Sequence, residues 1–527
     1  MQSDLKALEF DALRRLLEKL ASTPYGAEAA RHIEPAPDLN LARAMLAAVT
    51  AARSVLDAGA TPTLREVPDI RAALRQAANP GAALPGTALR NLQQVIAAVA
   101  ALRPAVAACP DLYPGPQEHL EPPPLLVQRL DRTILPSGRV REDASPRLDE
   151  LAAQLRTLRQ EVVGALTARI ERPDVRDAVS ADRIVWQGGR AMLAVAPGQV
   201  ERIRGVRRGT AGGKGDQLVE PMEVIARNNR VEALVGQQEV ETQALLRELT
   251  GFLRDHLATL GHMLDALTWI DLALAAGKLS AQFNAHAPQL VDTPRLQLDR
   301  AYHPALLLQF TGGQGPRPVP LSLTLDAHQP MLIVTGPNTG GKTVVLKTVG
   351  LLVTMAHCGL HIPAEGDCII GNFSRVIVDI GDPQSLYHHL STFAGHVEAL
   401  KRILRDAGSG TLVLLDELGT GTDPEEGAAL AMAVLDELAA RHVQGIVTTH
   451  LAPLKAFAAH HGGLTNASMA FDEERLKPTY QLQIGTSGRS LGLVIARNSG
   501  LPEEVVERAR AYLHGMAASR DRTPDGR

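Results

Sequence analysis

The sequence predicts a multidomain protein with a mainly helical first half, a small β-rich insertion in it, and a following α/β domain. The chain has 527 residues, which is more than one hydrophobic core normally serves. Up to about residue 290, apolar residues recur at helical spacing, except in a glycine-rich, β-like stretch near residues 183–214. From about residue 296, strand-like runs alternate with helical ones, which favours a largely parallel sheet covered by helices.

The composition excludes several classes of protein. Hydrophobic residues make up 45% of the chain and charged residues 21%, which is ordinary for a soluble globular protein. The three cysteines, Cys109, Cys358 and Cys368, form neither a disulfide framework nor a metal-binding C-x-x-C pair. The start does not resemble a signal peptide, and no uncharged apolar run is long enough to cross a membrane. We therefore expect a cytoplasmic protein without a membrane partner.

The expected domains follow the changes of pattern along the chain. The stretch between Pro221 and Pro288 has no proline and predicts one very long helix, or two placed end to end. A helix over 145–171, with Ser145 as N-cap and Pro146 at its first position, could pack antiparallel to it and carry the β-rich segment at the tip. We expect a helical core (1–125), a connector and first lever helix (126–180), a β-rich basic segment (181–232), a long second lever helix (233–288), an α/β domain (289–515) and a polar tail of disorder-like composition (516–527).

The β-rich segment is strongly basic within an acidic protein. Residues 183–214 contain seven arginines and lysines against one acid, Glu201, whereas the whole chain has a net charge of −4. A solvated loop face is the ordinary explanation of such a run, and contact with the phosphate backbone of a nucleic acid is the alternative. The residues predicted to make that contact are Arg190, Arg202, Arg204, Arg207, Arg208 and Lys214.

The α/β domain contains a nucleotide-binding motif. The strand-like run 331–335 is followed by G-x-x-x-x-G-K-[ST] at 336–343 and by an apolar helical run, which is the context that a P-loop requires. Glycines let backbone N–H groups surround phosphate oxygens, Lys342 reaches the β- and γ-phosphates, and the Thr343 hydroxyl binds Mg²⁺. The sequence therefore predicts a site for ATP and Mg²⁺ formed by Gly336, Pro337, Asn338, Thr339, Gly340, Gly341, Lys342 and Thr343.

A second motif follows the apolar run 412–415, which ends in Asp416 and Glu417. Asp416 is suited to hold the Mg²⁺ shell, and Glu417 is suited to act as general base on the attacking water, with Lys342 as a further catalytic residue. His450 ends the run GIVTTH, where a sensor of the γ-phosphate would lie. Acids or a lone histidine at strand ends are often only structural, but a P-loop upstream favours the catalytic interpretation.

Two polar positions between these motifs complete the predicted site. Gln384, in DIGDPQS, is predicted to report Mg²⁺ and the γ-phosphate. Ser391, in LSTF before a helical run, is predicted to complete the ATP site of a second subunit, and its alternative role is an ordinary helix N-cap. The order of these parts along the chain is that of ABC-type ATPases.

The segments GPNTGGKT, LSTF, LLDELGTGTDPEEG and TTHL together resemble the MutS family. LEFDALRRLL, DIGDPQS and NASMAFDEERLKPTYQLQIGTSGRS resemble its bacterial MutS-two branch, and the resemblance covers roughly residues 5–515. It implies an all-α core with lever helices, a small clamp at the lever tip, a dimerising ABC-type P-loop ATPase domain, and binding of branched DNA. In some members it implies action on stalled or collided ribosomes, and hence contact with rRNA.

The sequence also departs from the family pattern. It shows no N-terminal mismatch-recognition domain, and its one Phe-x-Glu, at residues 471–473, falls inside the α/β domain. No Leu-Asp-Leu-Arg-Gly-like nuclease motif occurs, so no nuclease activity is expected from these residues. The sequence leaves open whether the chain is a piece of a longer nuclease-bearing protein or a natural short form.

These observations predict a homodimeric ATPase that clamps and releases branched DNA, such as recombination intermediates, and restrains recombination without recognising mismatches. The first alternative is an RNA-directed role on stalled or collided ribosomes. A transporter-associated ABC subunit is disfavoured by the long helices and by the absence of a segment that would contact a membrane partner. An architectural dimer with an inactive ATPase is disfavoured by the intact Lys342 and Glu417.

Overall fold

The computed structural model describes residues 2–64, 66–211, 215–337, 340–380, 392–472, 475, 477–486, 493, 496–497 and 500–520. The chain divides into two compact units. The first unit comprises Met1–Arg65, Arg103–Gly115 and Leu267–Arg527, and the second comprises Glu66–Leu102 and Pro116–Ala266. Each unit is assembled from stretches that are distant in the sequence.

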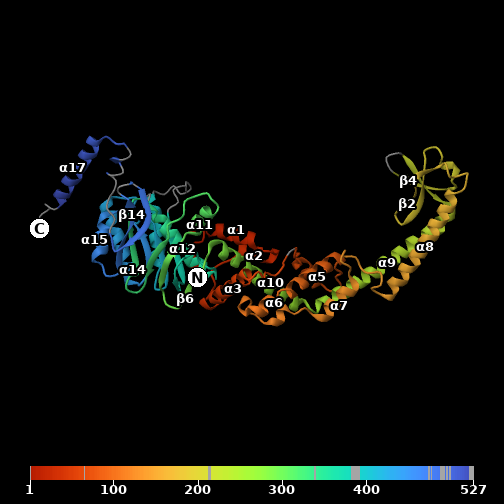
Figure 1. The fold of residues 1–527 in the computed structure, drawn as a ribbon, viewed down its shortest axis with the longest axis horizontal. Coiled ribbons are helices and arrows are strands. Elements are labelled where there is room, and N and C mark those ends of the chain that lie inside the picture. The colour runs from red at the N-terminus through yellow and green to blue at the C-terminus, as the bar shows by residue number, and fades with distance from the viewer. Residues whose placement is uncertain are drawn as a thin grey trace. The chain divides into compact units, whose positions relative to one another are not determined.

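A seven-stranded sheet forms the centre of the α/β part of the first unit (Figure 1). Its order is β1-β11-β12-β13-β9-β14-β15, and every neighbouring pair is parallel except β14 and β15. The largely parallel sheet agrees with the prediction, but the edge strand β1 comes from the first residues of the chain and was not expected. The strands are β1 (Gln2–Ser3), β9 (Met331–Thr335), β11 (Arg375–Asp379), β12 (Thr411–Leu415), β13 (Gln444–Thr448), β14 (Leu464–Asp472) and β15 (Lys477–Ile484).

The inner strands are apolar on both faces because helices cover both faces. Successive residues of a strand point to opposite sides, so Leu332 and Val334 of β9 join the buried cluster around α12, whereas Ile333 joins the cluster of the other helices. Because β9, β12 and β13 are parallel, the loops that follow them meet at one edge of the sheet. The covering helices are α12 (Lys342–His357), α13 (Thr392–Asp406), α14 (Pro424–Ala440) and α15 (Ala452–His460).

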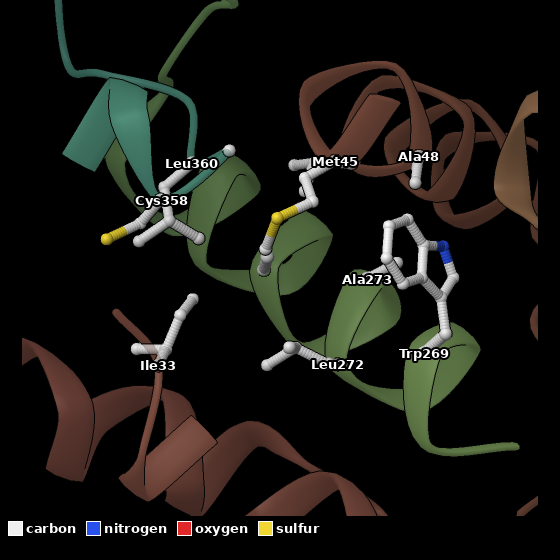
Figure 2. Close-up of a pocket in the computed structure, with 11 residues that line it drawn as sticks. Ile33, Met45, Ala48, Trp269, Leu272, Ala273, Cys358 and Leu360 are labelled. Atoms are coloured by element: carbon white, nitrogen blue, oxygen red, sulfur yellow. The ribbon is translucent and has the colours of Figure 1, made fainter. Parts of the chain in front are cut away.

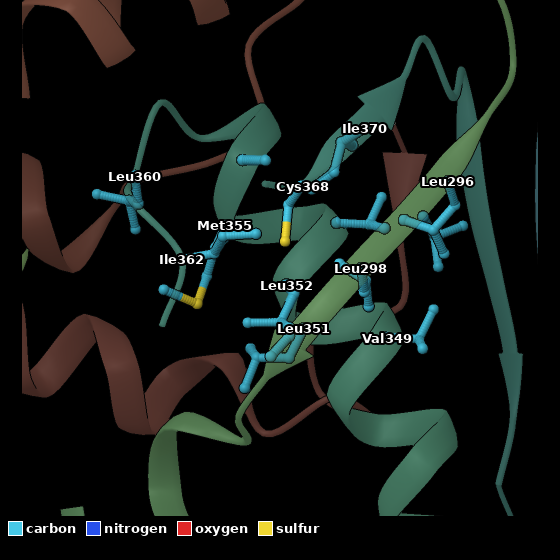
Figure 3. Packing of buried hydrophobic residues seen from close by; sticks show 14 of the residues in the cluster. Leu296, Leu298, Val349, Leu351, Leu352, Met355, Leu360, Ile362, Cys368 and Ile370 are labelled. Carbon is cyan, nitrogen blue, oxygen red and sulfur yellow. The ribbon is translucent and has the colours of Figure 1, made fainter. Parts of the chain in front are cut away.

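A second sheet of four strands shares a buried cluster with helix α12. Leu296 and Leu298 of this sheet lie in that cluster together with Val349 and Leu352 of α12 (Figure 3). The strand over residues 321–325 belongs to this sheet and not to the parallel one. In sheet order the strands are β6 (Gln289–Val291), β10 (Ile369–Gly371), β7 (Leu296–Ala301) and β8 (Leu321–Leu325), and α11 (Pro304–Thr311) follows β7.

The helical part of the first unit contains two helices, α3 and α10, that are long and apolar enough to cross a membrane. Both contribute side chains to the buried core, among them Leu46 of α3 and Leu279 of α10, and this burial accounts for their apolar composition. Helix α10 begins within the second unit and ends within the first. The helices are α1 (Phe10–Leu20), α2 (Pro24–Arg31), α3 (Leu39–Asp57), α6 (Arg103–Ala108), α10 (Leu257–Phe283), the 3₁₀ helix η1 (Pro110–Leu112) and the C-terminal α17 (Glu503–Arg520).

A fully buried carboxylate joins α10 to the start of α2. Asp271 is 0% exposed and accepts hydrogen bonds from the backbone N–H groups of Ser22 (2.9 Å) and Thr23 (2.8 Å) and from the Thr23 hydroxyl (2.7 Å). Thr23 is in turn the N-cap of α2, because its hydroxyl accepts from the Gly26 N–H. The network therefore holds two distant stretches of the sequence together.

We predict that Asp271→Ala destabilises the first unit by about 3 kcal/mol, because it leaves buried backbone N–H groups without an acceptor. Asp271→Asn is the control and should cost less, since its amide oxygen still accepts. The measurement is urea unfolding followed by the fluorescence of Trp269 in a Trp186→Phe background. A loss below about 1 kcal/mol for Asp271→Ala would contradict the prediction.

The second unit is built around two long antiparallel helices, α8 and α9, as predicted. At one end the Ser145 hydroxyl donates to Glu241 (2.9 Å), and at the other Arg169 lies 3.6 Å from Glu223. The proline-free stretch forms two helices, because a turn at residues 255–256 separates α9 from α10. The helices are α4 (Arg71–Ala77), α5 (Gly86–Ala100), α7 (Pro124–Thr133), α8 (Pro146–Ile170) and α9 (Met222–Arg254), with the 3₁₀ helices η2 (Gln117–Leu120) and η3 (Val200–Arg202).

A four-stranded antiparallel sheet lies at one end of the α8–α9 pair (Figure 1). Leu193 and Val219 on one face of this sheet pack with Leu166 of α8 and Val224 of α9. Strand β4 is an edge strand, and its residues 205–210 are exposed. We call this sheet the basic sheet; in order its strands are β2 (Val179–Gln187), β3 (Arg190–Val195), β5 (Asp216–Pro221) and β4 (Gly205–Ala211).

Candidate functional site

The P-loop joins strand β9 to helix α12. Gly336 and Gly341 have φ values of 136° and 91°, which L-residues with side chains rarely adopt. At Gly340 a Cβ atom would lie 3.2 Å from the Met469 Cβ, so the loop packs tightly on β14. Asn338 and Thr339 lie outside the described residues. The described glycines of the loop therefore have the backbone that close approach to phosphate oxygens requires.

Lys342 is the first residue of α12 and is 2% exposed. Its ammonium donates to the Gly336 carbonyl at 2.7 Å, so it lies over the loop. Burial lowers the pKa of Lys342, while the neighbouring carboxylates of Glu417 and Asp416 raise it. The Lys342 ammonium therefore interacts electrostatically with the two acids that follow β12.

Those acids meet the P-loop helix at the edge of the sheet. The Thr343 hydroxyl donates to Asp416 Oδ2 at 2.7 Å, and the Asp416 N–H donates to the Asp379 carbonyl at 2.8 Å. Glu417 has the left-handed φ of 54°, which is unusual for a residue with a side chain. A hydroxyl and a carboxylate at this distance form the hard oxygen set that Mg²⁺ prefers.

Thr448, the last residue of β13, is a further polar residue of this edge that the sequence did not single out. It is 0% exposed, and its hydroxyl donates to Asp416 Oδ1 and accepts from the Glu417 N–H at 2.9 Å. The signal available in the sequence was a threonine at the end of an apolar strand next to the acidic one. His450 follows two residues later and is exposed at the same edge.

The remaining predicted positions are only partly described. Gln384 and Ser391 lie outside the described residues, and helix α13 begins at Thr392. On that helix His396 Nδ1 lies 3.7 Å from the Asp379 carboxylate, which raises the pKa of the imidazole. An ion pair therefore links helix α13 to the end of strand β11, which neighbours β12.

Tyr480 of β15 also lies next to the P-loop and was not predicted. A Cβ atom at Gly341 would be 3.2 Å from Tyr480 Cδ1, and the tyrosine is 52% exposed with a φ of 59°. The ring is thus held beside the loop with much of its surface free. A residue 138 positions beyond Lys342 gives no local signal of such a contact.

A separate apolar pocket lies between α3, α10 and the end of α12 (Figure 2). Met45, Trp269, Leu272 and Cys358 are among the residues that line it. This lining has no charged group, so the pocket is not suited to a phosphate or a metal ion. Within the described part of the chain, no group of three or more metal-ligating side chains was found.

The basic sheet uses two of its predicted phosphate ligands internally. Glu220 is 0% exposed and pairs with Arg190 Nη1 and with Arg208 Nε, both at 2.8 Å. Arg190 also lies 2.6 Å from Glu232 of α9, so this network fastens the sheet to the helix. Arg190 is therefore part of a structural network and not of a free basic surface.

The other predicted phosphate ligands remain available at the surface. Arg202, Arg204 and Arg207 are exposed, and no ion pair is found for them among the described residues. Arg208 is 40% exposed, and its Nε pairs with Glu220. Lys214 lies outside the described residues. The exposed charge therefore gathers on and just before the edge strand β4.

The strand, loop and helix around Lys342, with an acidic pair after β12, form the arrangement that defines the P-loop class of proteins. A family model described as MutS domain V matches residues 332–517. The chain belongs to the MutS family, in its MutS2 branch.

Three curated relatives, each named Endonuclease MutS2, support this assignment. The Thermus thermophilus protein is 38% identical over 520 residues, which cover 97% of this chain and 66% of the relative. The Thermomicrobium roseum protein is 37% identical over 531 residues, which cover 98% of this chain and 66% of the relative. The Carboxydothermus hydrogenoformans protein is 39% identical over 388 residues, which cover 74% of this chain and 49% of the relative. The chain thus spans about two thirds or less of the length of these relatives.

Proposed function

We propose that this chain binds and hydrolyses ATP with Mg²⁺ at the P-loop. The observation that carries the proposal is the 2.7 Å hydrogen bond between Thr343 and Asp416. It joins the last residue of the P-loop motif to the first of the two acids that follow β12. The glycines and Lys342 would hold the phosphates, and Thr343 and Asp416 would hold the metal. Bound Mg²⁺ supplies charge neutralisation at the β- and γ-phosphates.

The proton chemistry falls to Glu417 in this proposal. Its carboxylate follows the metal-binding acid directly and would orient the attacking water and accept its proton. His450, exposed at the same edge, would contact the γ-phosphate. Gln384 and Ser391 would complete the site in a homodimer, with Ser391 serving the partner's nucleotide.

Tyr480 extends the proposed site to the adenine base. We predict that Tyr480→Ala weakens ATP binding about tenfold, because an aromatic ring beside the P-loop can stack on the base. Tyr480→Phe should bind normally, because it keeps the ring. The measurement is calorimetric titration of ATP and of inorganic triphosphate, which has no base. An equal loss for both ligands would show that the tyrosine only supports the loop.

We further propose that the basic sheet binds the phosphate backbone of branched DNA and that the protein restrains recombination without recognising mismatches. Three exposed arginines near one edge strand support this role, in a chain with a net charge of −4. The relatives carry the name endonuclease, but we assign only ATP hydrolysis and nucleic-acid binding to the residues present. The expected place of action is the cytoplasm.

The alternative partner is the ribosome, because backbone contact by arginines does not distinguish DNA from rRNA. The test is ATP turnover measured with duplex DNA, four-way junction DNA and collided ribosomes at one salt concentration. Strongest stimulation by junction DNA is the expected result. Stimulation by collided ribosomes alone would establish the alternative, and no turnover under any condition would refute the ATPase proposal.

A further inference from the structure

We propose that Thr448 is a positioning residue of ATP hydrolysis, which directs both acids that follow β12. The inference rests on the proposed ATPase activity and adds to it a residue outside the P-loop and the acidic pair. The observation is one buried hydroxyl that contacts two functional residues at once. It donates to Asp416 Oδ1 and accepts from the Glu417 N–H at 2.9 Å.

The two hydrogen bonds use the hydroxyl in the one way that its chemistry allows. A threonine hydroxyl has a single proton and two lone pairs. The proton goes to the Asp416 carboxylate, and a lone pair remains for the N–H of the next residue. A methyl group of the same size would serve neither partner, so the arrangement needs the oxygen and not the volume.

The bond to Asp416 sets the direction of its carboxylate. The torsion that rotates an aspartate carboxylate is broad and weakly restrained, so hydrogen bonds decide its orientation. Thr448 holds Oδ1 while Thr343 holds Oδ2, so the carboxylate is fixed from both sides. Oδ2 is thereby presented to the same P-loop hydroxyl that is proposed to bind the metal.

The bond to Glu417 holds an unusual backbone. Glu417 has a φ of 54°, and the Leu418 N–H donates to the Thr448 carbonyl at 3.0 Å, so Thr448 fixes this turn from both its hydroxyl and its backbone. Only the hydroxyl bond can be removed by substitution. Its loss leaves the Glu417 N–H without this acceptor and frees the turn that aims the proposed general base.

Three variants separate the hydroxyl from the methyl group. Thr448→Ser keeps the hydroxyl, Thr448→Val keeps the methyl group, and Thr448→Ala keeps neither. We expect kcat for ATP hydrolysis to fall about tenfold to a hundredfold in Thr448→Val and Thr448→Ala. In Thr448→Ser it should stay within about threefold of the parent. The KM, measured in excess Mg²⁺, should rise only by the Mg²⁺-dependent affinity that is lost, because the P-loop contacts to the phosphates are intact.

Nucleotide binding gives a readout that is independent of turnover. The dissociation constant of a fluorescent ATP analogue is measured in EDTA and in excess Mg²⁺. In EDTA all variants should match the parent within about twofold, whereas the gain in affinity on adding Mg²⁺ should be smaller for Val and Ala. Thr354→Val is the control, since its hydroxyl is equally buried and donates within α12 to the Gly350 carbonyl.

The outcomes are distinct for the two proposals. If the parent hydrolyses ATP and Val or Ala matches it, or if activity follows the methyl group and Ser is the slow variant, the role of Thr448 is refuted. If the parent binds the nucleotide without turnover, the ATPase proposal fails. The Mg²⁺ comparison then still decides whether Thr448 positions Asp416.

Discussion

The Glu417→Gln variant is expected to bind ATP normally and to hydrolyse it at least about a hundredfold more slowly than the parent. The substitution removes the proposed proton acceptor but leaves the Lys342 ammonium and the Thr343–Asp416 pair in place. The ATP-bound state should therefore accumulate. The measurement combines steady-state phosphate release with the dissociation constant of ATP.

The matched control for this prediction is Glu426→Gln. Glu426 is an exposed glutamate in the first turn of α14, so the change in charge and size is the same at a residue that is not part of the proposed site. Its turnover should equal that of the parent. Near-parent turnover in Glu417→Gln would assign the general base to another residue, with His450 the first to test.

Replacing Arg202, Arg204 and Arg207 with serine is expected to flatten the salt dependence of nucleic-acid binding. Each phosphate contact makes the slope of log K against log [salt] more negative by about 0.9 for duplex DNA. Losing three contacts should therefore reduce the magnitude of the slope by up to about three. Affinity should fall for all sequences alike, because phosphates carry no sequence information. The measurement is a salt titration of binding to junction DNA, with ATP turnover without DNA measured in parallel.

An equal removal of charge elsewhere in the second unit is the control. Arg75, Arg139 and Arg247 are exposed and belong to this unit but not to the basic sheet. Their replacement with serine should leave the slope within about one of the parent. An unchanged slope in the basic-sheet variant would show that its charges are only solvated, and a loss of turnover without DNA would indicate damage to the fold.

The local chemistry of the proposed nucleotide site could be predicted from the sequence. The spacing of Gly336, Lys342 and Thr343 defines the P-loop, because backbone contacts to phosphates need those residue types in that order. Asp416 and Glu417 could be recognised because they end an apolar run, and a buried parallel strand has that pattern. Helices α8 and α9 were predictable as helices, because an N-cap serine before a proline and a long proline-free stretch are local signals.

Contacts between distant residues could not be read in this way. The pairing of Glu220 with Arg190 and Arg208 depends on how strands β3, β4 and β5 align, so a count of charges overstated the free basic surface. Strand β1 at the sheet edge and Tyr480 beside Gly341 are likewise consequences of strand order.

Short motifs in the sequence thus predict which groups the proposed nucleotide site contains, because each motif combines the residue types that its chemistry needs. How those groups are held depends on the fold. Thr448 lies 31 residues beyond Glu417 in the chain and reaches it only because β12 and β13 are neighbours in a parallel sheet. Hydrogen bonds act over about 3 Å of space whatever the distance along the chain, so the fold alone selects such partners.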